Sequence, residues 1–291
     1  MKHLHRIIAP ALLAAGLHGT AHAKLVEQQF DLPVHVANAW GKVVEQPIRV
    51  TVYFNDATPA PRPIVLINHG RAVDADGRAA LGRARFPEAS RWFAERGFLV
   101  AVPTRIGYGV SGGEDVEDSG SCNNRLYPPV FRAAADQSLQ LLDVLRQRDD
   151  VVKDRTVLLG QSFGGATTVT LASLNPAGVV TAINFAGGGG GDPKAHPEQP
   201  CSPVQLRRMF AGYGQTAHVP MLWAYTENDR FFGATLPREW VQAFRDAGGQ
   251  AEFKQFPPHG EDGHLLFAKF PQVWQPVVAD FLRRQGFDIK D

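Results

Sequence analysis

Apolar runs alternate with amphipathic segments along most of the chain. Residues 62–68 (RPIVLIN) and 97–103 (GFLVAVP) are nearly continuous apolar runs, which is typical of strands buried on both faces of a parallel sheet. Between them, residues 86–97 show an amphipathic helical pattern that ends at a glycine. Residues 130–148 predict a longer amphipathic helix. This first half of the chain therefore indicates strands and helices in alternation.

The remaining segments, before and after these, extend the same pattern. Residues 24–55 read as β structure, and residues 240–249 and 273–286 read as late helices. Further strand-like runs, separated by helical segments, lie at residues 156–160, 178–186, 220–226 and 251–256. Strands that alternate with helices predict one α/β domain with a doubly wound, mostly parallel sheet.

The first 23 residues are expected to be a secretory signal peptide and not part of the fold. Lys2 and Arg6 form a basic start, an apolar stretch follows, and small residues at 21–23 offer a cleavage site. The apolar stretch is shorter than the roughly 20 residues of a membrane-spanning helix. We therefore expect a secreted or periplasmic protein whose single domain covers residues 24–291.

The nearly balanced charge of the chain argues against strongly charged binding partners. Without its first 23 residues the chain has 28 basic and 29 acidic residues, so neither nucleic acid nor a membrane is an expected partner.

The two cysteines, Cys122 and Cys201, lie in polar, turn-rich stretches and predict a disulfide, with two free thiols as the alternative. No zinc-binding spacing is present, and residues 259–264 (HGEDGH) lack the helical H-E-x-x-H pattern. We expect no metal and no cofactor; the oligomeric state is not indicated.

A candidate nucleophile stands where a predicted strand meets a helix. Ser162 lies between Gly160 and Gly164 in the pattern G-x-S-x-G, directly after the apolar run 156–160. Such a turn holds a serine in a strained conformation and needs small residues where strand and helix approach each other. The alternative is an ordinary turn with an inert serine. The strand before it and the helix after it favour a nucleophile.

A serine nucleophile needs a general base and an acid that orients the base. In this arrangement the chain order is serine, acid, histidine. His264 is the expected base, with His259 as the alternative, because both follow the predicted strand 251–256. Asp229 is the expected acid and Glu227 the alternative, because both follow the strand 220–226.

The oxyanion donors and the pocket walls are expected from nearby segments. The backbone N–H of Phe163, next to the serine, supplies one donor, and the N–H of Arg71, in the loop after residues 62–68, supplies the other. The alternative is that residues 69–70, at the start of this loop, form a plain turn with no role in the site. Tyr108, Trp223 and Phe231 are expected to give the substrate site apolar walls, although each is equally suited to the core.

Five segments together resemble the α/β-hydrolase superfamily, and within it the dienelactone-hydrolase-like branch. They are NHG, PTRIGYGVSGG, GQSFGG, WAYTENDRFF and GEDGHLLF. The resemblance implies a three-layer fold with an eight-stranded, mostly parallel sheet flanked by helices. It also implies a Ser162–Asp229–His264 triad at the carboxyl edge of that sheet. Dienelactone hydrolases proper use a cysteine nucleophile, so the resemblance does not extend to lactone specificity.

These observations predict a secreted serine esterase that cleaves a small-molecule ester through an acyl-enzyme. Asp229 follows Ser162 by only 67 positions (229 − 162), which leaves little room for a large cap, and we expect no large cap domain. A hydrolase of bulky or polymeric esters, such as polysaccharide acetyl groups or polyesters, and a peptidase remain alternatives. A non-catalytic binding protein on this scaffold is disfavoured, because such a protein has no need to keep all three residues.

Overall fold

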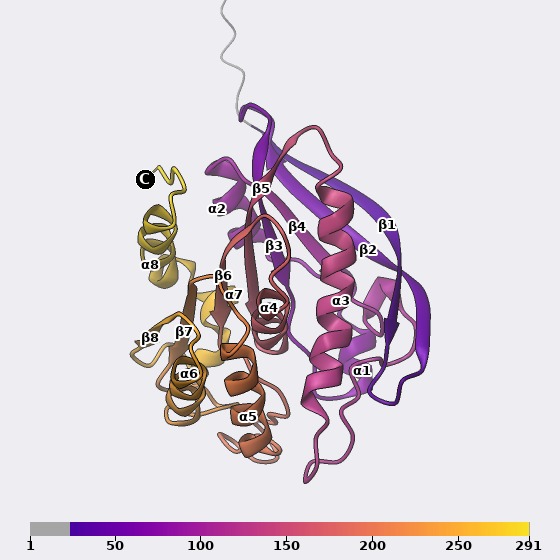
Figure 1. Ribbon diagram of the computed structural model, residues 1–291, viewed down its shortest axis with the longest axis vertical. Helices are drawn as coiled ribbons and strands as arrows, with labels where there is room; N and C mark the ends of the chain where they lie inside the picture. Colours follow the sequence, from indigo (N-terminus) through magenta and orange to yellow (C-terminus); the bar gives the residue numbers. More distant parts are fainter. Residues whose placement is uncertain (1–23, 291) are drawn as a thin grey trace, which may run out of the picture.

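One eight-stranded sheet runs through the centre of the computed structural model, which describes residues 24–290 (Figure 1). The predicted signal peptide, residues 1–23, lies outside the described residues. The strands are β1 (Leu25–Ala37), β2 (Val43–Asn55), β3 (Arg62–Asn68), β4 (Leu99–Thr104), β5 (Val151–Gln161), β6 (Val179–Phe185), β7 (Met221–Thr226) and β8 (Ala251–Phe256). Their order in the sheet is β1-β2-β4-β3-β5-β6-β7-β8.

The sheet is mostly parallel, as predicted. β1 and β2 form a long antiparallel hairpin, and β2 pairs antiparallel with β4. Every pairing from β4 onward is parallel. The carboxyl ends of β3, β5, β7 and β8 therefore meet at one edge, where an open α/β sheet usually places its ligand site.

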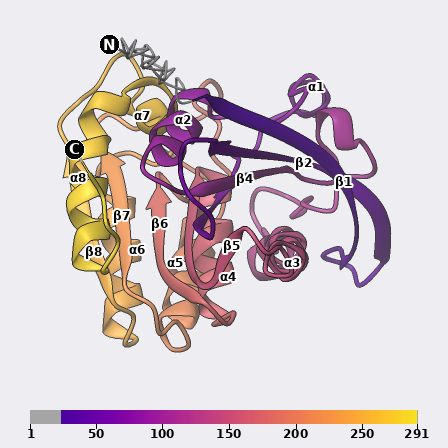
Figure 2. The same cartoon turned by 90° about the horizontal axis from the view of Figure 1, so that it is seen from above.

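Helices cover both faces of the sheet and make three layers (Figure 2). The helices are α1 (Ala75–Ala79), α2 (Pro87–Glu95), α3 (Tyr127–Leu145), α4 (Phe163–Ser173), α5 (Pro203–Gly214), α6 (Leu236–Asp246), α7 (Leu266–Lys269) and α8 (Pro271–Arg284), with short 3-10 turns η1 (Gly109–Ser111) and η2 (Gly263–Leu265). Ile64 and Leu66 of β3 join the core under α3 to α6, whereas Val65 and Ile67 join the core under α2 and α8. Because successive side chains point to opposite faces, a strand buried on both faces must be apolar throughout.

The elements agree with the sequence pattern except at some ends. The run 62–68 coincides with β3, whereas the helix predicted over 130–148 begins at Tyr127 and ends at Leu145. Its first turn contains prolines, which break most helix interiors but are accommodated at the first positions, where the missing N–H has no intrahelical partner. No helix within residues 24–290 combines the length and apolar character that crossing a membrane requires.

An aromatic cluster fixes α8 on the sheet. The Trp274 ring packs against Trp92, Phe93 and Phe185, and its indole Nε1–H donates to the backbone oxygen of Phe267 at 3.0 Å. Trp274 is fully buried. A large ring with a satisfied polar atom contributes both burial and orientation at this position.

Replacing Trp274 with alanine should lower the free energy of unfolding by about 3–5 kcal/mol, because it leaves a large cavity and an unpaired carbonyl. Trp40, which is 59% exposed, provides the matched control, and Trp40→Ala should change stability by less than about 0.5 kcal/mol. Equilibrium denaturation of the two variants measures the difference. Equal losses in both would contradict the packing described here.

Candidate active site

Ser162 lies in a tight turn between β5 and α4. Its backbone has φ 59° and ψ −126°, a left-handed conformation that is rare for any residue except glycine. The flanking glycines allow it: a Cβ on Gly160 would lie 2.0 Å from the backbone oxygen of Gly164, and one on Gly164 would lie 2.2 Å from that of Asn68. The strand, the helix and the end of β3 thus pack backbone against backbone, and the serine side chain points away from them.

His264 joins this serine to a carboxylate. The His264 Nε2 atom lies 2.8 Å from the Ser162 Oγ atom, and Nδ1 lies 2.9 Å from the Asp229 Oδ2 atom. Asp229 follows β7 and His264 follows β8, so the parallel sheet brings them together from 35 residues apart. Because an ionised carboxylate only accepts hydrogen bonds, it selects the tautomer in which Nδ1 carries the proton and Nε2 accepts from the hydroxyl.

The surrounding loops hold these groups in place. Asp229 Oδ1 accepts hydrogen bonds from the backbone N–H groups of Phe231 and Phe232, at 2.8 and 3.1 Å. The Phe231 ring stacks on the His264 imidazole, with centroids 4.0 Å apart. Asp262 links the two loops, since its Oδ1 accepts from the N–H of Arg230 and of His264, both at 3.0 Å. These contacts hold the Asp229 carboxylate and the His264 imidazole in position.

Two backbone N–H groups beside Ser162 remain available. Within residues 24–290, the amides of Phe163 and Arg71 donate to no other group. Phe163 is the first residue of α4, where the helix dipole favours negative charge. The loop that carries Arg71 runs against the nucleophile, because a Cβ on Gly70 would lie 3.2 Å from that of Ser162. Both predicted oxyanion donors therefore flank the serine.

A buried charged network lies behind the Arg71 loop. The guanidinium of Arg105 is paired with Glu117, and both side chains are fully buried. Arg105 also donates to the backbone oxygen of His69 at 2.7 Å and, through its own backbone N–H, to the His69 Nε2 at 3.1 Å. The Arg71 side chain makes two hydrogen bonds to Asp115, at 2.8 and 2.6 Å. These contacts hold the loop that carries His69 and Arg71 in place.

Burial and neighbouring charges shift the pKa values of the groups in this network. Burial and the neighbouring Arg105 charge hold the pKa of His69 well below its usual value, so His69 is neutral. Burial and the Glu117 charge raise the pKa of Tyr108. Tyr108 therefore stays protonated, and its hydroxyl donates a hydrogen bond to the Glu117 carboxylate. Although burial opposes its charge, hydrogen bonding to Asp115 raises the pKa of Arg71.

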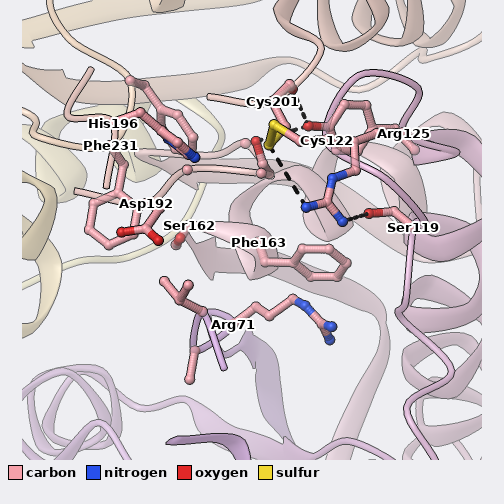
Figure 3. A pocket seen from close by; sticks show the side chains of 18 residues that line it. Arg71, Ser119, Cys122, Arg125, Ser162, Phe163, Asp192, His196, Cys201 and Phe231 are labelled. Atoms are coloured by element: carbon pink, nitrogen blue, oxygen red, sulfur yellow. Dashed lines mark hydrogen bonds between the residues drawn. A yellow bond between two sulfur atoms is a disulfide. The ribbon is translucent and has the colours of Figure 1, made fainter. Parts of the chain in front are cut away.

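A cavity of about 210 Å³ opens beside Ser162 (Figure 3). Its apolar walls come from Tyr127, Phe163, Phe231 and Phe232, and a backbone wall comes from residues 188–191. The glycines of that wall press against rings, since a Cβ on Gly188 would lie 2.6 Å from the Phe232 ring and one on Gly191 would lie 2.8 Å from the Phe231 ring. Polar side chains at the rim are Arg71, Ser119, Arg125, Asp192 and His196.

Two of the three predicted wall residues lie elsewhere. Phe231 lines the cavity, but Tyr108 is turned into the Glu117 network. Trp223 is enclosed by the Phe210 and Phe244 rings on the α5–α6 side of the sheet. A side chain of β7 that points toward the helices covering the sheet is buried whatever its chemistry, which is why residue type alone misplaced Trp223.

Sequence reasoning missed other residues around the cavity. Phe232, Tyr127, Arg125 and His196 line it, and Asp262 orders the histidine loop. Phe232 and Asp262 lie within the segments WAYTENDRFF and GEDGHLLF but were given no role, and the other three lie outside the five segments. The only available signal was proximity in sequence to Asp229, His264 and the two cysteines. The predicted disulfide is present: Cys122 and Cys201 are bonded and both line the cavity.

Fold and site together define an α/β hydrolase. The family model for the dienelactone hydrolase family matches residues 52–264, well over half of the chain, and the chain belongs to that family. The resemblance inferred from the motifs is confirmed.

Solved structures share the fold at low identity. An acetyl xylan esterase from Paenibacillus sp. R4 has 16% identity and a TM-score of 0.60, covering 90% of this chain and 88% of its own. One from a Thermoanaerobacterium species has 13% identity and a TM-score of 0.57, with coverages of 91% and 89%. A candidate dienelactone hydrolase from Klebsiella pneumoniae has 14% identity and a TM-score of 0.54, with coverages of 89% and 99%.

The neutral state of His69 predicts a dependence of stability on pH. In the unfolded chain a histidine takes up a proton below about pH 6.5, whereas folded His69 stays neutral to lower pH. Unfolding therefore becomes easier as the pH falls below about 6.5, by up to about 1.4 kcal/mol per pH unit. In His69→Asn this slope should become shallower, while His218→Asn, at an exposed position, should keep it. Denaturant titrations at several pH values measure both; equal slopes in the wild type and His69→Asn would contradict the assignment.

Proposed function

We propose that this protein is a serine esterase that hydrolyses carboxylic esters with small acyl groups. The observation that carries the proposal is the continuous line of two contacts, 2.8 Å from Ser162 Oγ to His264 Nε2 and 2.9 Å from His264 Nδ1 to Asp229. Membership of the dienelactone hydrolase family supports a hydrolase, and because a serine stands in place of a cysteine, lactone specificity is not part of the proposal.

In the first half of the reaction, Ser162 Oγ attacks the ester carbonyl carbon as His264 Nε2 takes the hydroxyl proton. Negative charge develops on the carbonyl oxygen, where the N–H groups of Phe163 and Arg71 stabilise it. Asp229 stabilises the imidazolium and keeps its orientation. The imidazolium then gives its proton to the departing alkoxide, and the alcohol leaves an acyl group on the serine.

In the second half, a water molecule takes the place of the alcohol. His264 removes its proton as the water oxygen attacks the acyl carbon, and the same two N–H groups stabilise the second oxyanion. Collapse of this intermediate returns the proton to Ser162 and releases the carboxylic acid.

The cavity favours a short acyl chain. Its volume of about 210 Å³ is below the usual range of roughly 300–1,000 Å³ for sites that enclose a drug-sized ligand. The glycine wall at residues 188–191 already lies against the Phe231 and Phe232 rings, so the cavity does not widen without moving that wall. An acetyl or propionyl group fits these limits.

Export of the protein is part of the proposal. The basic start and short apolar stretch of residues 1–23 support it, and a disulfide between Cys122 and Cys201 is typical of an oxidising compartment. The enzyme would then meet its ester in the periplasm or outside the cell.

Replacing Ser162 with alanine should abolish labelling by a fluorophosphonate and lower kcat on p-nitrophenyl acetate by about 10⁴-fold or more, because the attacking oxygen is lost. Asp229→Asn should lower kcat by about 10⁴-fold, since it selects the wrong imidazole tautomer. Ser121→Ala removes an exposed serine and serves as the matched control. Labelling that persists in Ser162→Ala would assign the nucleophile elsewhere, and a wild type that is neither labelled nor active would favour a binding protein.

Activity on p-nitrophenyl esters should fall steeply with acyl length, with kcat/KM at least about tenfold lower for octanoate than for acetate, because the longer chain needs more volume than the cavity has. Initial rates over a series from two to eight carbons measure the trend, and peptide p-nitroanilides in the same assay test for a peptidase. A rate that rises with chain length would contradict the small acyl site, while leaving the Ser162 assignment intact.

A further inference from the structure

Three potential metal ligands meet at the rim of the cavity. Cys122 lies in the loop before α3, and His196 and Cys201 lie in the loop between β6 and α5. One ligand atom of each lies within 4.8 Å of the other two. Figure 3 shows the disulfide and His196 along the same side of the cavity, with Ser162 below them in this view. The cysteines are 79 residues apart, so no sequence spacing could have indicated the group.

His196 carries an unused ring nitrogen at this point. Its Nδ1 atom is buried and has no hydrogen-bond partner within residues 24–290. A buried polar atom without a partner costs about 1–3 kcal/mol, so most such atoms in proteins are satisfied by a protein group, a water or an ion. Neutral imidazole is the commonest metal ligand, and an imidazole nitrogen beside two sulfur atoms matches a donor set that Zn²⁺ prefers.

The disulfide is placed so that it can be opened. Cys122 is exposed, whereas Cys201 is only 5% exposed, so an external thiolate reaches the Cys122 sulfur first. The Arg125 Nη2 atom lies 3.8 Å from the Cys201 Sγ atom. A guanidinium beside the leaving sulfur stabilises the thiolate that exchange produces, which favours attack at Cys122 and departure of Cys201.

We propose that reduction of this disulfide by a dithiol creates a Zn²⁺ site formed by Cys122, Cys201 and His196. One thiolate of the dithiol attacks the Cys122 Sγ atom, the Sγ–Sγ bond breaks, and its electron pair leaves on Cys201. The second thiol of the reductant then displaces Cys122 and closes to a disulfide, so two electrons pass from the dithiol to the protein. Binding of Zn²⁺ by the two sulfurs as thiolates releases the two protons that the reduced pair had gained.

The separations are compatible with a tetrahedral ion. With Zn–S near 2.3 Å and Zn–N near 2.0 Å, the ligand atoms of such a site lie about 3.5–3.8 Å apart. The bonded sulfurs would have to separate, and the His196 nitrogen, now within 4.8 Å of both, would need to move by no more than about 1.3 Å. Arg125 would then donate to a metal-bound sulfur, as outer partners of zinc ligands commonly do. Three protein ligands leave the fourth position open, facing the cavity that Ser162 also lines.

Cobalt binding to the full-length mature chain tests the proposal. Protein is reduced with dithiothreitol, freed of it by gel filtration without oxygen, and titrated with Co²⁺ and then Zn²⁺. The reduced chain should bind one Co²⁺ with a thiolate-to-cobalt charge-transfer band and the visible bands of tetrahedral cobalt, and one Zn²⁺ should displace it. The oxidised chain should show neither band. Absence of the charge-transfer band in the reduced chain, or equal binding by both forms, would overturn the proposal.

Variants locate the ion and guard against unfolding. Cys122→Ser should abolish the charge-transfer band or weaken it strongly. His196→Asn keeps both cysteines, so its oxidised form is purified with the disulfide intact, and its reduced form should bind Zn²⁺ at least about tenfold more weakly. His218→Asn, at an exposed position, is the matched control. Near-ultraviolet circular dichroism verifies that each reduced chain is folded. Equal Zn²⁺ affinity in His196→Asn and His218→Asn would remove His196 from the site and overturn the proposal.

Discussion

The crossing of β3, β5 and α4 at Ser162 is the constraint on which the rest of the site depends. Left-handed backbone at a serine costs about 1–3 kcal/mol and persists only where its surroundings require it. Here the Ser162 N–H donates to Phe185 in β6 at 2.8 Å, and its backbone oxygen accepts from Gly165 and Gly188. The same residue therefore links the strand, the helix and the glycine wall of the cavity. Because these hydrogen bonds fix the backbone of Ser162, they also fix the direction of its side chain, which contacts His264.

The Arg71 loop, which carries one proposed oxyanion donor, is held by charged groups and not by apolar packing. A fully buried pair such as Arg105 and Glu117 is expensive to desolvate, and it is tolerated only when further hydrogen bonds satisfy both groups. Here those bonds go to the backbone oxygen of His69 and to the Tyr108 hydroxyl, directly behind the loop that carries Arg71. A rigid loop keeps its N–H in place before any substrate arrives, which is what stabilisation of a developing oxyanion requires.

One loop, residues 186–202, contributes to every distinctive feature of the cavity. Its glycines form the cavity wall that would limit the acyl group in the proposed reaction, and its Cys201 and His196 belong to the proposed metal site. Cys201 is anchored twice, since its N–H donates to the Gly190 oxygen at 2.9 Å and its own oxygen accepts from the Tyr127 hydroxyl. These bonds do not involve the sulfur, so they persist when the disulfide is opened. Hydrolysis and metal binding would therefore share a wall that stays anchored in either redox state.

The amino-acid sequence by itself determined the layers of the fold, the position of Ser162 and a short set of candidates for its two partners at the sheet edge. Apolar runs identify buried strands, and glycines at fixed offsets identify the turn at Ser162, because both patterns reflect local backbone geometry. Chain order narrowed the acid to Asp229 or Glu227 and the base to His264 or His259, since parallel strands end at one edge, and the tertiary contacts select Asp229 and His264. Only the tertiary structure decided that Trp223 is core, that Tyr108 serves Glu117, and that His196 lies beside the cysteines. Loop side chains have no periodicity, so their neighbours depend on contacts between segments far apart in the chain.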